Sequence, residues 1–543
     1  MARIALIAQA GNIWARALLE SLRRARPTLE YNLAEPVGFC REAAEQDSEL
    51  SCVYTPSLTD KEGVMPDLSE AERVFQQSAG VRPSKFILLS SAIIYGTGPA
   101  RKSLVTEDYS GRSFGTDRIC RRWKSLEAAA ARHLKANVPL VILRPATVLP
   151  SPVFLSRRLM RQLIVTLPGH DPVLQLLSLG DLAEAVLCAV ERGRPGAFNV
   201  APDGVIPLSA AALIARSHRV PLPRTLQRVT VDSAALEYLR YPWTISNTKI
   251  RMELGFAPHK SSAAALMECR NLREPTSSAE LTFDEFGMDA DYIRFFSNTL
   301  FKFLCDFYWR IETRGLEHIP RQGPGVLVGM HRGFMPWDGV MALHQLVQNT
   351  GRIPRFLTHP GLLKFPFICN FVRKLGGVVA CRESADRVLE GGELLGVFPE
   401  GVHAAFLPYR KAYRLQSFGR DDFVKMALRH RAPIVPFVTV GSAEILPVLW
   451  QVKPRWWTRY SGWPCLPIST FPFLPLPLPS KWHTRFLPPI HTEEQYPPET
   501  ALDASVVKAI SLEVRTKMQE AVDEMLRRRR SIFFGPIFKP EGG

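Results

Sequence analysis

Short apolar segments alternate with helical patterns through the first half of the chain, and no other feature limits its fold as strongly. The apolar segments have the length and composition of buried strands. Strands that alternate with helices form parallel sheets covered by helices on both faces. Residues 1–270 are therefore predicted to form an α/β domain with a Rossmann-type, doubly wound parallel sheet. The strand-like segments are 4–8, 85–91 and 139–145, and the helical ones include 14–23, 117–134 and 181–192.

The second half of the 543-residue chain alternates in the same way. An aromatic helix is expected over 291–312 and a charged amphipathic helix over 503–531, whereas 453–490 is rich in Pro and Trp and indicates a long ordered loop. Residues 271–290 are polar, acidic and without apolar periodicity, which predicts a linker. We therefore expect a second α/β domain over 291–543. Its strand-like segments are 325–330, 376–381, 394–401 and 433–441.

The net charge is +16, from 68 Lys+Arg against 52 Asp+Glu. Basic proteins bind nucleic acids, anionic lipid headgroups, or phosphorylated and CoA-like substrates. The chain has no zinc-finger spacing, no ribonucleoprotein motif and no basic tail, so we expect no nucleic-acid partner. The nine cysteines are scattered without a C-x-x-C pair, which favours a reducing cytosol and argues against a metal site.

The first residues, MARIALIAQAG, read as a buried strand, and we expect no signal peptide. The sequence contains no window of about 18 uninterrupted apolar residues, which predicts no transmembrane helix. Aromatic and basic residues are mixed in 292–310 and in 453–463, as in segments that lie at a membrane interface. We therefore expect a cytoplasmic protein that contacts the inner face of a membrane peripherally. Arg527–Arg530 are a further candidate for contact with anionic lipid.

The turn after the first strand is the place for a dinucleotide fingerprint, in which three glycines bend the chain and admit the pyrophosphate. Here the three positions hold Ala8, Gly11 and Trp14. One glycine of three is a weak signal. The ribose position also lacks a clear acidic residue, because Glu30 and Glu35 are only candidates.

Four later segments, 86–96, 141–149, 178–190 and 196–204, follow in an order that resembles the extended short-chain dehydrogenase/epimerase family over nearly all of residues 1–270. The resemblance implies a Rossmann-type fold and a Tyr-x-x-x-Lys pair with an upstream Ser or Thr. Lys124 fits, but Cys120 occupies the tyrosine position. We expect a degenerate domain that kept the fold and lost the redox reaction, and NAD(P) binding stays open. The candidate cofactor-binding residues are Gly11, Ser90, Tyr95 and Lys124.

Acyl transfer from a thioester to an alcohol needs a base, a carboxylate that orients the base, and a cationic pocket for phosphate. His331 directly follows the strand-like segment 325–330, and Asp338 begins a helical run. Arg382 follows the next strand-like segment, and Phe-Pro-Glu-Gly follows another. With the strand at 433–441, these blocks resemble the glycerol-phosphate/lysophospholipid acyltransferase family across about residues 295–535.

The resemblance implies that His331 is the general base and Asp338 its partner. It implies no metal and no cofactor beyond an acyl-CoA or acyl-carrier-protein donor, and a glycerolipid acceptor. Six residues separate His331 from Asp338, where the family usually has four. Val402 and His403 replace the usual Thr-Arg, which looks more like the mono- and diacylglycerol acyltransferase branch. The implied substrate-binding residues are Arg332, Gly333, Arg382, Phe398, Pro399, Glu400, Gly401, Arg410 and Lys411.

Three functions are compatible with these patterns. The first is an acyltransferase that acylates a lysophospholipid, glycerol-phosphate or acylglycerol-like hydroxyl. The second is an NAD(P)-dependent oxidoreductase or epimerase in the first half. The third is a non-catalytic, membrane-associated scaffold. The ordered blocks around His331 favour the first.

Overall fold

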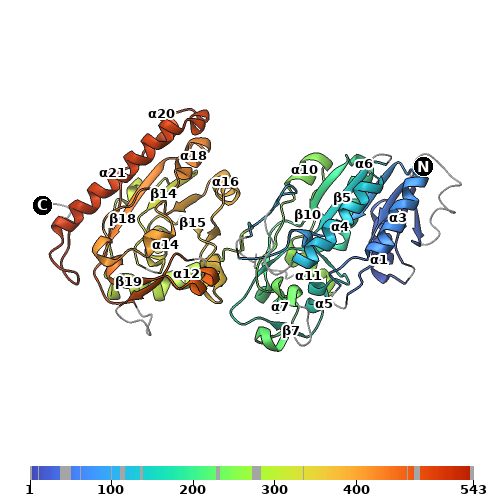
Figure 1. Cartoon of the computed structure of the whole chain (residues 1–543), viewed down its shortest axis with the longest axis horizontal. Helices are drawn as coiled ribbons and strands as arrows, with labels where there is room; N and C mark the ends of the chain where they lie inside the picture. The colour runs from blue at the N-terminus through green and yellow to red at the C-terminus, as the bar shows by residue number, and fades with distance from the viewer. Residues whose placement is uncertain are drawn as a thin grey trace. The chain divides into compact units, whose positions relative to one another are not determined.

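Contacts within a computed structural model divide the chain into two compact units, Met1–Gly287 and Met288–Gly543 (Figure 1). The division falls inside the segment 271–290, where the sequence predicts a linker, although 272–282 lie outside the described residues. The structure describes residues 3–9, 11–36, 50–60, 63–99, 101–110, 117–134, 138–227, 233–271, 283–333, 335–461, 463–469 and 477–538.

A parallel sheet forms the centre of the N-terminal unit. Its strand order within the described residues is β10-β5-β4-β3-β1-β2, and every neighbouring pair is parallel. The predicted Rossmann-type sheet is therefore confirmed. The strands are β1 (Arg3–Ile7), β2 (Glu30–Ala34), β3 (Leu50–Tyr54), β4 (Lys85–Leu89), β5 (Leu140–Pro145) and β10 (Gly196–Val200).

Helices cover both faces of this sheet because successive strand residues point to opposite sides. In β1, Ile4 and Leu6 pack with α1 (Ile13–Ala25) and α6 (Leu179–Arg192), whereas Ala5 and Ile7 belong to the core on the other face. That second core includes apolar residues of α3 (Leu68–Val81) and α4 (Asp117–Leu134), which pack side by side (Figure 1). The alternation fixes the doubly wound arrangement.

The C-terminal unit holds a second sheet, with the strand order β13-β21-β18-β14-β17-β15-β16. Strands β14, β15, β16, β17 and β18 run parallel, while β18 and β21 are antiparallel. All five residues of β14 are buried. The strands are β13 (Glu312–Arg314), β14 (Gly325–Gly329), β15 (Pro354–Thr358), β16 (Val378–Val379), β17 (Leu394–Val397), β18 (Ile434–Val440) and β21 (His483–Phe486).

The predicted single helix over 291–312 is wrong in its continuity. The structure divides it into α12 (Ala290–Asn298), α13 (Leu300–Phe303) and the π-helix η2 (Leu304–Tyr308). The break lies at Thr299, whose ψ of −96° is not helical and whose hydroxyl donates to the main-chain oxygen of Phe295 at 2.7 Å. A threonine that bonds back to the preceding turn competes with the helical hydrogen bonds.

The predicted long loop over 453–490 is also wrong in part. It contains α19 (Arg455–Ser461), β20 (Leu466–Ser469) and β21, while residues 470–476 lie outside the described residues. The hairpin strand β19 (Val448–Val452) pairs with β20. The C-terminal helix α21 (Ala504–Arg528) matches its expected range and packs on β18.

No helix in the described parts of the chain has both the length and the apolar character needed to cross a membrane.

His483 in β21 provides a pH test of this sheet. Its side chain is fully buried, and burial lowers its pKa to about 4. An unfolded histidine has a pKa of about 6.5, so between these values only the unfolded chain binds the proton. We therefore expect the free energy of unfolding to fall by roughly 2–3 kcal/mol between pH 6.5 and pH 4. Urea titrations followed by hydrogen exchange in β21 should show this loss, and His483→Gln should reduce it; an unchanged pH dependence in that variant would contradict the assignment.

Candidate active site

The central strand β14 delivers His331 to the carboxyl edge of the C-terminal sheet. Met330 is buried, and His331 follows at the point where the chain leaves the sheet. In open α/β sheets, ligands bind at this edge. The side chain of His331 is 15% exposed, so the ring is held by its surroundings and still reaches solvent.

Asp338 contacts His331 although six residues separate them. Both carboxylate oxygens lie 2.9 Å from Nδ1 of His331. The same carboxylate accepts hydrogen bonds from the main-chain N–H groups of Arg332 at 2.8 Å and Gly339 at 2.9 Å. Asp338 lies in the first turn of α14 (Trp337–Thr350), where the helix dipole favours a negative charge.

This contact fixes the tautomer of the histidine. A carboxylate only accepts hydrogen bonds, so Nδ1 of His331 carries the proton and Nε2 keeps its lone pair. The loop between the two residues turns back at Gly333, whose φ of +81° suits glycine. A buried carboxylate therefore orients an imidazole whose second nitrogen is free to accept a proton.

Phe398, directly after β17, forms an aromatic support for His331. The two ring centroids are 5.1 Å apart, and Phe398 stacks on Phe356 at 5.5 Å. Gly329 makes this packing possible, because a Cβ there would meet ring carbons of Phe398 at 2.5 Å and of Phe437 at 2.4 Å. The small residue at the end of β14 is thus required by the ring of Phe398, which contacts the histidine, and by the ring of Phe437.

A buried ion pair joins the residue after His331 to the Phe-Pro-Glu-Gly turn. Arg332 Nη1 and Nη2 donate to Glu400 Oε1 and Oε2 at 2.8 and 2.9 Å, and the two side chains are 1% and 0% exposed. Arg332 Nη1 also donates to the main-chain oxygen of His331 at 2.7 Å. The pair therefore holds the histidine through its backbone. Both side chains were expected to bind substrate, but here they satisfy each other.

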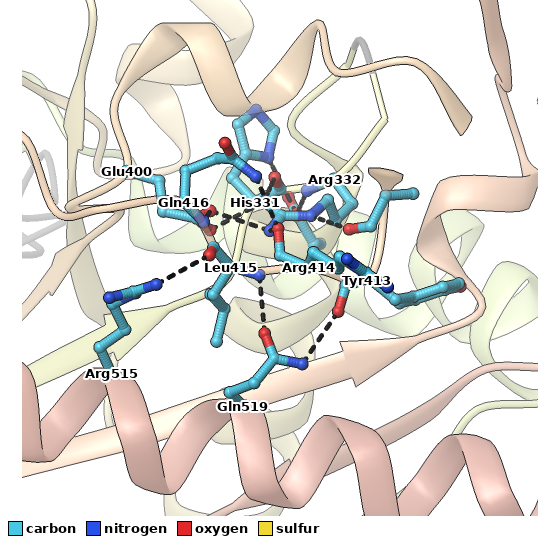
Figure 2. A network of polar contacts seen from close by, with 11 residues as sticks. His331, Arg332, Glu400, Tyr413, Arg414, Leu415, Gln416, Arg515 and Gln519 are labelled. Carbon is cyan, nitrogen blue, oxygen red and sulfur yellow. Dashed lines mark hydrogen bonds and ion pairs between the residues drawn. The ribbon is translucent and has the colours of Figure 1, made fainter. Parts of the chain in front are cut away.

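The same pair holds the segment that follows η5 (Tyr409–Lys411). Arg332 donates to the main-chain oxygens of Ala412 and Arg414, and Glu400 accepts from the N–H of Gln416 at 2.6 Å. Figure 2 shows this segment between the ion pair and the C-terminal helix.

Gln519 of α21 braces that segment from its other side. Its Oε1 accepts from the N–H of Leu415 at 2.8 Å, and its Nε2 donates to the main-chain oxygen of Tyr413 at 3.2 Å (Figure 2). Gln519 has no signal in the sequence, since only the fold brings it to residues about a hundred positions away. The C-terminal helix thus supports the site indirectly.

The remaining residues of the turn act through their backbone. Gly401 has a φ of +72° and begins α17 (Val402–Ala405), while the main-chain oxygen of Pro399 accepts from the N–H of Gly419 at 3.2 Å. A positive φ at this point favours glycine. The turn is therefore shaped by Gly401 and anchored by Glu400.

The predicted cationic residues lie along the same sheet edge. Arg410 and Lys411 are exposed on η5, directly before Ala412. Arg382 begins α16 (Arg382–Glu390) after β16, is 65% exposed, and donates to Asp386 at 3.3 Å. Three strand spacings of roughly 4.8 Å put the ends of β14 and β16 about 14 Å apart. Arg382 therefore lies on the edge that carries His331 but is separated from it by two strands.

Two residues of the C-terminal arginine cluster, Arg527–Arg530, form ion pairs within the protein. Arg529 is buried and pairs with Glu444, which also accepts from Tyr409 and Tyr413. Arg528 pairs with Glu524 at 2.8 Å on α21. The buried Arg529 is therefore not available to the lipid contact that the sequence suggested for 527–530.

In the N-terminal unit, two of the four cofactor candidates belong to one buried network. Arg144 donates to both carboxylate oxygens of Glu127 and to the hydroxyl of Tyr95. Ser90 donates to Glu127 at 2.6 Å, and Tyr95 donates to Asn199 at 2.7 Å. Burial raises the pKa of Tyr95 to about 12, against the opposing effect of Arg144. Both hydroxyls are thus engaged with protein groups.

Lys124 and Gly11 lie apart from this network. Lys124 is exposed on α4, whereas Cys120 of the same helix is buried and its thiol lies 3.6 Å from the main-chain oxygen of Ile93. A Cβ at Gly11 would meet no atom within 4 Å, so no close packing requires glycine there.

The turn after β1 does not fit a dinucleotide pyrophosphate. Glu70 is buried at this edge of the sheet, where it accepts from Gln9 at 2.7 Å, from Tyr54 at 3.1 Å and from Ser57 at 2.8 Å. Asn12 already caps α1 by accepting from the N–H of Ala15. A buried carboxylate repels the charge that a pyrophosphate brings. We derive no redox step from this unit.

Comparison with known proteins bears on the C-terminal site. The family model described as Acyltransferase matches residues 310–440, which include His331, Asp338 and Glu400. The protein Rv0502 of Mycobacterium tuberculosis is 38% identical over 268 residues, covering 48% of this chain and 73% of Rv0502. The chain therefore belongs to the same family as Rv0502, and its C-terminal half contains an acyltransferase domain. The protein ML2427 of Mycobacterium leprae is 35% identical over 303 residues, covering 54% of this chain and 79% of ML2427.

A bovine protein, named DGAT1/2-independent enzyme synthesizing storage lipids, is 26% identical over 133 residues. The match covers 24% of this chain and 39% of the bovine enzyme. Among solved structures, MoeE5 in complex with UDP-glucose and NAD has 12% identity and a TM-score of 0.41, covering 50% of this chain and 97% of MoeE5. UDP-N-acetylglucosamine 4-epimerase from Bacillus cereus has 14% identity and a TM-score of 0.39, covering 50% of this chain and 99% of the epimerase. We assign the Rossmann-type fold of the N-terminal unit from its own strand order.

Breaking the Arg332–Glu400 pair leaves one buried charge without a partner. We expect Arg332→Met or Glu400→Leu alone to lower the free energy of unfolding of the C-terminal unit by about 3–5 kcal/mol. The double variant should recover most of this loss, because no charge is then left unpaired. Urea denaturation followed by hydrogen exchange measures each variant, with Arg382→Met at the exposed Arg382–Asp386 pair as the control. Additive losses in the double variant would contradict the pairing.

Gly329→Ala tests the aromatic support. The added methyl group overlaps the rings of Phe398 and Phe437, so we expect a loss of about 1–3 kcal/mol in the free energy of unfolding. Gly419→Ala is the matched control, because a Cβ at Gly419 would meet no atom within 4 Å. Urea midpoints compare the two variants. Equal midpoints for both would show that Phe398 does not need the glycine.

Proposed function

We propose that the protein transfers a fatty acyl group from an acyl thioester, acyl-CoA or acyl-carrier protein, to a hydroxyl group of a glycerolipid. The observation that carries the proposal is the contact between Nδ1 of His331 and the buried carboxylate of Asp338 at 2.9 Å. This contact leaves Nε2 as a base at an edge of the sheet that solvent reaches. The reaction uses no metal and no cofactor besides the acyl donor.

In the proposed reaction His331 transfers the proton and Asp338 stabilises the charged form of His331. Nε2 of His331 takes the proton of the acceptor hydroxyl, and the oxygen attacks the thioester carbonyl carbon directly. The C–O ester bond forms, the C–S bond breaks, and the departing thiolate receives the proton from the imidazolium. Asp338 stabilises the imidazolium while it exists. No acyl-enzyme intermediate forms.

Exposed cations at the same sheet edge support an anionic substrate group. Arg410 and Lys411 lie on η5, next to the segment that Arg332 holds, and Arg382 lies at the end of β16. Guanidinium and ammonium groups bind phosphate well. A phosphate of the acceptor or of CoA is the group we assign to them. Gly333 and the turn 398–401 form the wall of the acceptor site through their backbone.

The bovine relative supports a lipid product, because its name describes an enzyme synthesizing storage lipids. Exposed aromatic residues support an acceptor that lies in a membrane. Phe295, Phe303 and Phe307 are exposed on 290–308, and Trp450 and Trp456 are exposed on β19 and α19. Aromatic side chains near Lys and Arg favour the membrane interface. We therefore propose peripheral contact with the cytoplasmic face of a membrane.

The two other functions have less support. Two groups argue against a redox or epimerase reaction in the N-terminal unit. The buried thiol of Cys120 replaces the tyrosine, and the Glu70 carboxylate lies at the edge where a pyrophosphate would bind. A non-catalytic scaffold gives no reason for an oriented, solvent-reaching histidine beside a buried carboxylate.

The deciding experiment compares His331→Ala with wild type. The full-length protein is incubated with acyl-CoA and lysophospholipid or monoacylglycerol vesicles, and mass spectrometry quantifies the acylated lipid. We expect the variant to lose about 100-fold or more of the product. His491→Ala is the control, because Nδ1 of His491 also contacts a carboxylate, Glu493, at 2.8 Å outside the site. Equal product from His331→Ala and wild type would overturn the proposal.

A further inference from the structure

Arg101 of the N-terminal unit is a buried cation, and three of its five N–H donors have no hydrogen-bond partner. The residue is 4% exposed. Its Nη1 donates to the main-chain oxygens of Thr244 at 3.1 Å and Lys102 at 3.4 Å. Its Nε and Nη2 are buried and have no hydrogen-bond partner. Among the described residues, no carboxylate pairs with it.

The two unused nitrogens form one edge of the guanidinium group. Nε–H and Nη2–H point in nearly the same direction, and this fork matches the two oxygens of a carboxylate or phosphate. Nη1, on the opposite edge, is the nitrogen that the protein backbone holds. The backbone contacts thus fix the plane of the side chain, while the edge with Nε and Nη2 is buried without a hydrogen-bond partner.

The side chains that act most strongly on the charge of Arg101 are the phenols of Tyr109, Tyr238 and Tyr95 and the thiol of Cys120. None of these neutralises a cation at neutral pH. Tyr238 donates its hydroxyl to the main-chain oxygen of Ile93 at 3.0 Å, and Tyr95 donates to Asn199, so both are already engaged. Burial lowers the pKa of Arg101 to about 10, which still leaves it charged at pH 7.

A buried charge without a partner is expensive, and folded proteins retain such groups where they bind an opposite charge. The free fork, the fixed backbone edge and the surrounding phenols are the elements of a receptor for an anion. We propose that Arg101 binds the carboxylate or phosphate group of a small molecule through the edge of its guanidinium group that carries Nε and Nη2.

This site stands apart from the acyl-transfer proposal, since its residues all belong to the N-terminal unit. It is also different from the sheet edge at the ends of β1 and β3 beside Glu70, where the family resemblance places a dinucleotide. The thiol of Cys120, which occupies the position of the tyrosine in the dehydrogenase/epimerase resemblance, is among the groups that act on the charge of Arg101. We infer that the N-terminal unit retains a ligand site for a small anion where it has lost the residues for redox chemistry.

The test uses the full-length protein with inorganic phosphate and with acetate as probes, at constant ionic strength set by chloride. Isothermal titration calorimetry gives the dissociation constant, and hydrogen exchange reports on 101–105 and 244–246, which Arg101 joins. We expect either anion to bind at millimolar concentration or tighter and to slow exchange in these segments. Arg101→Gln should weaken binding at least tenfold, and Arg101→Lys should not restore it fully, because lysine lacks the fork.

Arg118→Gln is the matched control. Arg118 is exposed and lines a surface cavity of about 560 Å³ with Arg121 and Arg122, where a basic protein could also collect phosphate. Binding that is lost in Arg118→Gln and kept in Arg101→Gln would overturn the proposal. An absence of anion-dependent protection in 101–105 would overturn it as well.

A further variant separates ligand binding from folding. Without a bound anion, Arg101→Met removes an unpaired buried charge, so its thermal unfolding midpoint in chloride buffer should equal or exceed that of wild type. The same variant should lose the rise in midpoint that phosphate causes in wild type. A variant that unfolds several degrees lower in chloride would show that Arg101 serves the fold alone, and would contradict the proposal.

Discussion

The buried ion pair between Arg332 and Glu400 connects the parts of the C-terminal site. One partner follows His331 directly, and the other lies in the turn after β17. Through main-chain oxygens and N–H groups the pair also holds residues 412–416, which Gln519 of α21 supports from outside. A bidentate arginine–carboxylate pair fixes distance and plane at once. The loop with the histidine, the turn and the segment after η5 thus share one anchor.

Residues at the ends of two strands and in one helix complete the candidate site around this ion pair. Strand β14 ends at His331, the first turn of α14 supplies Asp338, and Phe398 lies under the ring. Gly329 and Gly333 are the places where a side chain would interfere, one by overlap with aromatic rings and the other by its positive φ. The geometry of the candidate site therefore depends on small residues as much as on charged ones.

Much of the fold and part of the candidate site could be predicted from the sequence. The parallel sheets follow from strand–helix alternation. His331, Asp338 and 398–401 stand out because their blocks follow in an order that resembles the acyltransferase family. The pairing of Arg332 with Glu400 did not follow, because the residues are 68 positions apart and local patterns do not encode such contacts. The break at Thr299 was missed for a related reason, since the aromatic periodicity continues through it. Arg101 gave no signal, as an arginine in a loop is normally exposed.

The central claim is that the ion pair places His331 for acyl transfer. The most direct measurement is the rate of acyl transfer from acyl-CoA to a lysolipid by the Arg332→Met/Glu400→Leu double variant, beside wild type and His331→Ala. The claim predicts a folded double variant whose rate falls about 100-fold or more, because remote misplacement of catalytic groups costs about that much. A folded double variant with the wild-type rate, or a wild-type rate no higher than that of His331→Ala, would contradict it.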